Sequence, residues 1–326
     1  MNAAIFDKLK LEGLLSASSV ENIQAQKATQ LFSVHWEIRT ILYLGISLLT
    51  GGLGILVYKN IDSLSHQFVL LFIALICAAS FFYCFKKKLP FSFEKVKAPN
   101  AFFDYILLLG CLTFIIFIAY FQYQYNIFGN RYGLATFIPM LLLFFTAYYF
   151  DHLAVLSLAI TNLAAWLGIS VTPLQILQEN DFNSNTIILV GIVLGIFLVT
   201  VGLASLQKNI KAHFEFTYTN FGIHILFISL LAAMFQFDGI HLIIFLALIA
   251  VAFYFYKRAI KEQSFYLLLV STLYAYIGFT YVFINMLSYS FSSGVGIFYL
   301  GFIYFIASGI ALILFLMRTN KKFKAS

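Results

Sequence analysis

Charged residues are scarce in this chain of 326 residues, because Asp, Glu, Lys and Arg together make up only 10% of it. A soluble globular domain contains about 25% charged residues. Apolar residues make up 62% of the chain, aromatic residues 19%, and the mean hydropathy is +0.93. So few polar side chains cannot cover the outside of a water-soluble fold. The composition therefore excludes a soluble domain and predicts that lipid surrounds the protein.

Cysteine is also rare, and each of the three cysteines lies in an apolar run, at Cys77, Cys84 and Cys111. An odd number without a C-x-x-C pair predicts no disulfide framework, and small packing side chains are their expected role. A cleavable signal peptide is not expected, since the first residues are polar and mixed in charge. The first apolar run begins near Ile38 and is expected to act as an uncleaved anchor.

Motifs of the common enzyme classes are absent: the sequence has no G-x-S-x-G, H-E-x-x-H, Walker A lysine loop or complete G-x-G-x-x-G. Asp238 and His241 have ligand chemistry but no third ligand nearby in the sequence, so we expect neither a metal nor a cofactor. The net charge of +7 does not indicate a nucleic-acid partner, because membrane orientation and anionic headgroups both favour basic residues beside spans. An intramembrane enzyme is therefore less favoured than the two functions described below, transport or binding and a membrane scaffold.

Ten apolar runs dominate the chain, each near the roughly 20 residues that cross about 30 Å of hydrocarbon. They lack the alternation of barrel strands, so they predict helices and an all-α, polytopic transmembrane bundle. Connections of about two residues predict tight antiparallel hairpins between runs four and five and between runs seven and eight. The predicted spans are 38–58, 67–85, 101–122, 132–150, 152–171, 185–206, 216–236, 239–256, 264–286 and 293–317.

Basic residues predict the orientation of these spans. Five lysines lie between residues 86 and 97, in a short loop between two spans, and such loops face the cytoplasm. Alternation from this loop places both termini in the cytoplasm and leaves only Lys59 and Arg131, of the 20 Lys and Arg residues, on the outside. Residues 318–326 then form a basic cytoplasmic tail behind a membrane domain at 38–317.

Residues 1–37 form the one sizeable polar segment and are predicted to be a cytoplasmic helical hairpin. Gly13 is expected to end a first amphipathic helix. Ser18 and Glu21 then have the spacing of a capping box that starts a second helix. A hairpin this short cannot hold a full core, so we expect it to dock on the membrane domain or on a cytoplasmic partner.

Polar residues within or beside the spans are the candidate site, because an unpaired polar group is costly in hydrocarbon. Asn220 and His224 are four residues apart and share a helix face. One inward-open polar cavity would unite all the candidates; hydrogen bonds at separate helix contacts, or scattered water-exposed ends, are the alternatives. The six candidates are Asp104, Asp151, His152, Asn162, Asn220 and His224.

Two stretches resemble a family of bacterial multi-pass membrane proteins known only as a domain of unknown function. One is Leu9-Lys10-Leu11-Glu12-Gly13-Leu14-Leu15-Ser16 with the second helix and the Gly-rich first span; the other is Phe150-Asp151-His152-Leu153-Ala154-Val155-Leu156-Ser157-Leu158, leading to Leu163-Ala164-Ala165-Trp166-Leu167-Gly168. The resemblance implies a protein of the bacterial inner membrane and supplies no catalytic residues.

The favoured function is transport or binding of a small solute or lipid through a cytoplasm-facing polar cavity. The alternative is a membrane scaffold whose hairpin at 1–37 recruits a cytoplasmic partner. Ten spans also permit two inverted five-span halves, although loop lengths and the position of Pro139 do not repeat between the halves.

Overall fold

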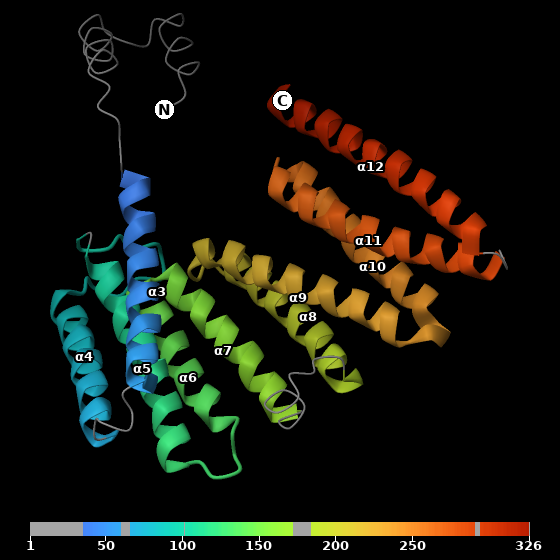
Figure 1. Ribbon diagram of the computed structural model, residues 1–326. Helices are drawn as coiled ribbons and strands as arrows, with labels where there is room; N and C mark the ends of the chain where they lie inside the picture. The colour runs from blue at the N-terminus through green and yellow to red at the C-terminus, as the bar shows by residue number, and fades with distance from the viewer. Residues whose placement is uncertain (1–34, 60–65, 101, 172–183, 291–293, 326) are drawn as a thin grey trace, which may run out of the picture. The chain divides into compact units, whose positions relative to one another are not determined.

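The computed structural model describes residues 35–59, 66–100, 102–171, 184–290 and 294–325, and in these ranges every regular element is helical (Figure 1). The predicted all-α fold is therefore confirmed, whereas the predicted hairpin at 1–37 lies almost wholly outside the described residues. The helices are α3 (His35–Lys59), α4 (His66–Lys87), α5 (Phe103–Tyr125), α6 (Leu134–Phe150), α7 (Leu153–Val171), α8 (Asn185–Gln207), α9 (Glu215–Gln236), α10 (His241–Lys261), α11 (Phe265–Ser290) and α12 (Gly294–Ala325), with short 3-10 helices η2 (Ala212–Phe214) and η3 (Asp238–Ile240).

Each predicted span corresponds to one helix from α3 to α12. Within the described residues, eight of these helices are long and apolar enough to cross a membrane. The other two contribute shorter apolar segments, Thr40–Gly52 of α3 and Leu134–Phe150, which is α6. The basic residues predicted as a tail continue α12 as helix to Ala325.

The chain divides into two units, residues 1–58 and 59–326. In the first unit, α3 runs without interruption across the glycines at 51, 52 and 54. These glycines therefore do not break the helix.

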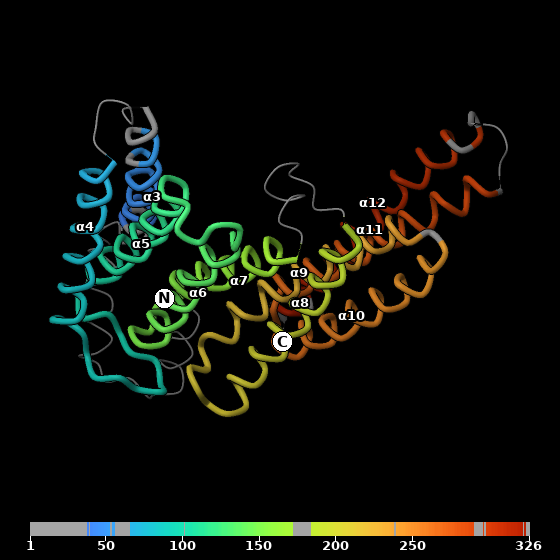
Figure 2. Tube along the Cα trace, turned by 90° about the horizontal axis from the view of Figure 1, so that it is seen from below, coloured from blue at the N-terminus to red at the C-terminus, as the bar shows by residue number. Residues whose placement is uncertain are grey.

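The second unit is a series of helix pairs in which each helix packs against its neighbour in sequence: α4 with α5, α6 with α7, α8 with α9, and α10 with α11. Figure 2 shows the chain reversing direction between the two helices of a pair, as between α8 and α9. The predicted hairpins at Asp151-His152 and at Phe237-Asp238 are both confirmed. Phe227, Leu248, Phe255 and Leu268 belong to the buried core that joins α9, α10 and α11.

Glycine allows α8 and α9 to approach most closely. A Cβ atom on Gly195 would lie 2.7 Å from the backbone nitrogen of Leu226, and one on Gly222 would lie 2.9 Å from that of Val199. These are backbone atoms, which cannot rotate away. Gly191 and Gly195, spaced as a G-x-x-x-G pattern, both lie at this contact.

Candidate functional site

The junction between α6 and α7 is built from two of the predicted site residues. Asp151 ends α6 in the left-handed region (φ 60°), which aspartate tolerates better than most residues. His152 follows as the N-cap of α7, since its Nδ1 accepts the backbone N–H of Val155 at 3.2 Å. Two residues thus reverse the chain. They leave the Asp151 carboxylate free of the backbone hydrogen bonds of α6 and α7, so that it can bind other groups.

Three groups from elsewhere in the chain surround that carboxylate. His213 Nε2 donates to Asp151 Oδ1 at 2.6 Å, and the Nζ atom of Lys211 lies 3.3 Å from the same oxygen. The other oxygen, Oδ2, accepts the backbone N–H of Val96 at 2.5 Å. The side chains of Asp151 and Lys211 are both only 1% exposed, so this is a buried ion pair completed by hydrogen bonds.

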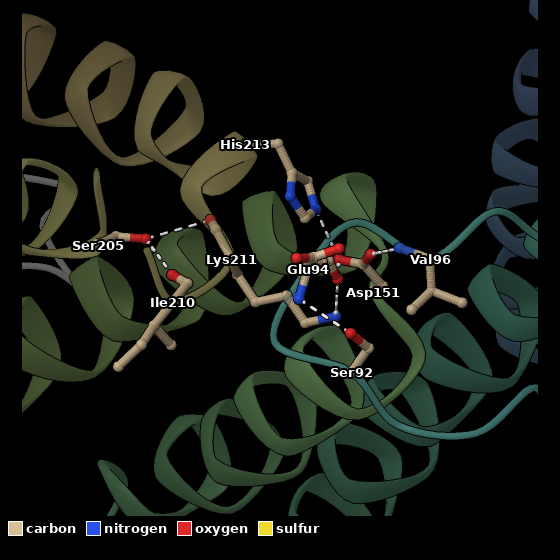
Figure 3. Close-up of polar contacts among 8 residues, drawn as sticks. All are labelled: Ser92, Glu94, Val96, Asp151, Ser205, Ile210, Lys211 and His213. Atoms are coloured by element: carbon tan, nitrogen blue, oxygen red, sulfur yellow. Dashed lines mark hydrogen bonds and ion pairs between the residues drawn. The ribbon is translucent and has the colours of Figure 1, made fainter. Parts of the chain in front are cut away.

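Lys211 also ties the connection between α8 and α9 to the basic loop after α4. Its backbone N–H donates to the carbonyl of Phe93 at 2.8 Å, and its Nζ donates to the carbonyl of Glu94 at 3.2 Å. Ser205 near the end of α8 donates to the carbonyls of Ile210 and Lys211. Figure 3 shows Val96, Lys211 and His213 gathered around Asp151, with Ser205 bonded to Ile210 and Lys211 on the far side of Lys211.

Three helix connections therefore meet at one point: the loop 88–102, the junction at Asp151-His152, and the turn 208–214. The predicted alternation of ten spans would place all three on the same side of the membrane, which their contact requires. We name the side chains of Asp151, Lys211 and His213 the junction cluster. Asp151 was singled out from the sequence, whereas Lys211 was counted there only as loop charge and His213 was not considered.

Asp104 lies beside this cluster rather than within it. It is the second residue of α5, so it lies at the end of that helix. An acidic side chain in that first turn is favoured by the helix dipole. Its Oδ1 lies 3.8 Å from Nε2 of His152, which places three predicted residues, Asp104, Asp151 and His152, at one end of the bundle.

Asn220 and His224 belong to a different group, which we name the α9–α11 array. His224 bonds through Nε2 to the Tyr266 hydroxyl at 2.8 Å and through Nδ1 to the Tyr274 hydroxyl at 2.9 Å. The Tyr266 hydroxyl donates in turn to Oδ1 of Asn220. The predicted shared face of Asn220 and His224 is confirmed, because both contact Tyr266. The two tyrosines were missed, since a single tyrosine in an apolar run carries no distinguishing pattern.

Of the six predicted residues, Asp151 belongs to the junction cluster with Asp104 and His152 beside it, Asn220 and His224 belong to the array, and Asn162 belongs to neither. Asn162 donates to the carbonyl of Leu158 in its own helix at 3.0 Å. The junction cluster comes from the end of α6 and from the turn 208–214, whereas the array joins α9 to α11. Among the described residues, a cavity of about 280 Å³ between α10, α11 and α12 is lined mainly by apolar side chains and by none of the six.

Residues 7–156 match the model of a family described as "Predicted membrane protein (DUF2157)". The match includes α3 to α6 and the Asp151-His152 junction, so the resemblance to a membrane family of unknown function is confirmed over that stretch. The comparisons with curated proteins and with solved structures find no match. The apolar helices and the family match together make this a multi-pass integral membrane protein.

Proposed function

We propose that the protein transports a small polar solute across the membrane together with a proton, and that the α9–α11 array is the intramembrane part of the path. The observation that carries the proposal is a continuous chain of four hydrogen-bonding side chains between two apolar helices. Ionisable residues within spans are rare because hydrocarbon disfavours them. Those that are found there commonly mark substrate and proton paths.

Donor counting gives the array a direction. Tyr266 has one hydroxyl proton, which it donates to Asn220, so its oxygen must accept from Nε2 of His224. The neutral imidazole then carries its proton on Nε2, and Nδ1 accepts the proton of Tyr274. A proton that reaches Nδ1 converts His224 into a double donor and reverses the bond to Tyr274. The array can therefore hold one extra proton by reorienting one hydroxyl.

The array also extends inward from a helix end. Tyr266 is the second residue of α11, at the end predicted to face the cytoplasm, and Tyr274 lies eight residues further, about 12 Å along the helix axis. The ring of Tyr274 stacks on that of the buried Phe227 with centroids 4.8 Å apart. A proton or solute entering at Tyr266 would thus meet an apolar closure beyond Tyr274, as alternating access requires.

Interhelical hydrogen bonding alone is the competing explanation. Such bonds within membranes contribute about 0.6 kcal/mol on average, so losing one should leave a folded protein. The two explanations differ in what removal of the imidazole does to transport.

The test uses purified protein in liposomes under an imposed proton gradient, with labelled amino acids, sugars and small carboxylates offered in turn. We expect solute-dependent proton entry, measured with an internal pH dye. His224→Leu should reduce that entry by about 100-fold or more, the scale on which loss of a proton-transferring side chain acts. The yield and the thermal unfolding of the variant should stay close to those of the unmodified chain.

The matched control is His66→Leu, because His66 also bonds a tyrosine hydroxyl, Tyr120, at 2.8 Å between α4 and α5. Its replacement should leave solute-coupled proton entry within about twofold. Equal losses in the two variants, or full uptake in His224→Leu, would contradict the proposal.

A further inference from the structure

We infer that the loop 88–102, together with the adjoining end of α6, binds the phosphate group of an anionic phospholipid in the leaflet predicted to face the cytoplasm. This inference is independent of the transport proposal, since it uses none of the array residues. It rests on the charge of the loop, on its exposed aromatic side chains, and on a polar recess that holds two lysines.

Within the part of the chain that the structure describes, no salt bridge neutralises a lysine of this loop. Residues 86–102 contain five lysines and a single acidic residue, Glu94. The nearest buried carboxylate, that of Asp151, is already held by Lys211, His213 and the Val96 amide. The positive potential of the lysines is therefore directed outward, where anionic headgroups would be attracted.

Exposed aromatic side chains place the loop at the depth of the headgroups. Phe93 is 60% exposed and Phe102 is 64% exposed, although neither is part of a helix. Water would disfavour such side chains, whereas the boundary between headgroups and acyl chains accepts them. The loop joins the last residue of α4 to the first of α5, so it lies where two spans leave the membrane.

A recess between the loop and α6 presents two of the lysines to this layer. It is lined by Lys88 and Lys97 together with Pro90, Tyr149 and Phe150. The Nζ atom of Lys88 bonds the Tyr149 hydroxyl and lies 4.3 Å from the centre of that ring. The enclosed space is about 20 Å³, room for about one water-sized group, so it suits a phosphate oxygen and not a whole headgroup.

The backbone between the two lysines is held in place by hydrogen bonds to other parts of the chain. The Phe93 and Glu94 carbonyls accept from Lys211, and the Val96 amide donates to Asp151. Because the backbone that carries Lys88 and Lys97 is already ordered, less conformational entropy is lost when a phosphate binds them than on a flexible loop.

The experiment counts lipids retained by the full-length protein in neutral detergent, using native mass spectrometry with added phosphatidylglycerol or phosphatidylcholine. We expect one saturable phosphatidylglycerol adduct and none of comparable affinity with phosphatidylcholine. The double variant Lys88→Gln, Lys97→Gln should weaken that adduct by about 30-fold. Lys88→Arg with Lys97→Arg keeps both charges and should retain it.

Lys257→Gln with Lys261→Gln is the matched control, since it removes two exposed lysines from the end of another span, α10. It should change the affinity by no more than about threefold. If the two double Gln variants lost the same affinity for phosphatidylglycerol, the lipid would be held by overall positive charge and not by this recess, which would overturn the inference. Displacement of the lipid by millimolar inorganic phosphate, or equal retention of phosphatidylcholine, would overturn it as well.

Discussion

Lys211 illustrates how one residue can hold three connections together. Its backbone is in the left-handed region (φ 50°), which costs a residue with a Cβ about 1 kcal/mol or more. The conformation is retained because the amide bonds Phe93 while the Nζ atom reaches Glu94 and Asp151. Because the side chains of Lys211 and Asp151 are both only 1% exposed and contact other protein groups, we expect the junction cluster to act as a structural brace.

A double-mutant cycle tests that role. Lys211→Met leaves the buried Asp151 carboxylate with fewer partners, and Asp151→Asn leaves the buried ammonium without its counter-charge. Each single variant should lower the free energy of unfolding by about 3 kcal/mol. The double variant should lose clearly less than the sum, because it removes both charges together.

The readout for this cycle is reversible unfolding in mixed detergent micelles. Lys208→Met serves as the control: Lys208 is exposed three residues earlier, and its replacement should stay within about 0.5 kcal/mol. Additive single effects in the cycle would show that Lys211 and Asp151 do not interact.

At the scale of elements, the pair α8 and α9 is the tightest contact in the second unit. Four glycines along it, two of which are Gly195 and Gly222, stand where a Cβ would come within 3 Å of the partner helix. Apolar side chains gain nothing from leaving lipid for another helix, so close backbone approach and dispersion must supply the attraction. The pair positions Lys211 at its turn and the array residues on α9.

Gly195→Ala should therefore separate the two helices. The added methyl group would meet the backbone of Leu226, and overpacking of this kind costs about 1–3 kcal/mol. Gly301→Ala in α12 is the control, because its Cβ would meet no atom within 4 Å. There the change should stabilise slightly, by about 0.5–1 kcal/mol, as it does in ordinary helix interiors. Thermal unfolding of the two variants should shift in opposite directions; shifts of the same sign would contradict this account.

The helices were predictable and the site was only partly so, for a physical reason. Apolar runs of membrane length predict helices because hydrocarbon forces each segment to satisfy its own backbone. Helix ends are less constrained, which is why α10 continues five residues beyond the predicted end of its span and α12 includes the basic tail. Polar partners such as Tyr266 and Lys211 depend on which helices meet, and a single sequence does not encode that in any local pattern.

Asn162 is a second residue whose contact could not be predicted from the sequence. A mid-span asparagine indicates a functional or interhelical contact by its cost alone, yet here the amide donates to the Leu158 carbonyl of its own turn. A local bond of this kind is available to any helix and needs no partner. The cost of a polar group therefore identifies a candidate without naming its contacts.

For the whole molecule, the junction cluster links three connections that are far apart in sequence. The loop 88–102, the junction at Asp151-His152 and the turn 208–214 are each separated by an even number of predicted spans. Segments that touch through buried hydrogen bonds must lie on one side of the membrane. The contact therefore supports the alternation of spans α5 to α8, while the bias of basic residues predicts which side that is.

Reporter fusions test both parts of this topology. Fusions ending after Lys97, after Lys211 and at the carboxyl terminus should report the cytoplasm, because nearly all Lys and Arg residues flank the same ends of the helices. Fusions near Asn130 and Asp181 should report the opposite side. Adding four lysines beside Asn130 should reduce the outside signal there, whereas four glutamines should not, since positive charge is what orients short loops. If fusions after Lys97 and after Lys211 reported opposite sides, the buried contact between Lys211 and the loop 88–102 could not exist in the membrane. If two adjacent loops reported the same side, the ten-span alternation would be wrong.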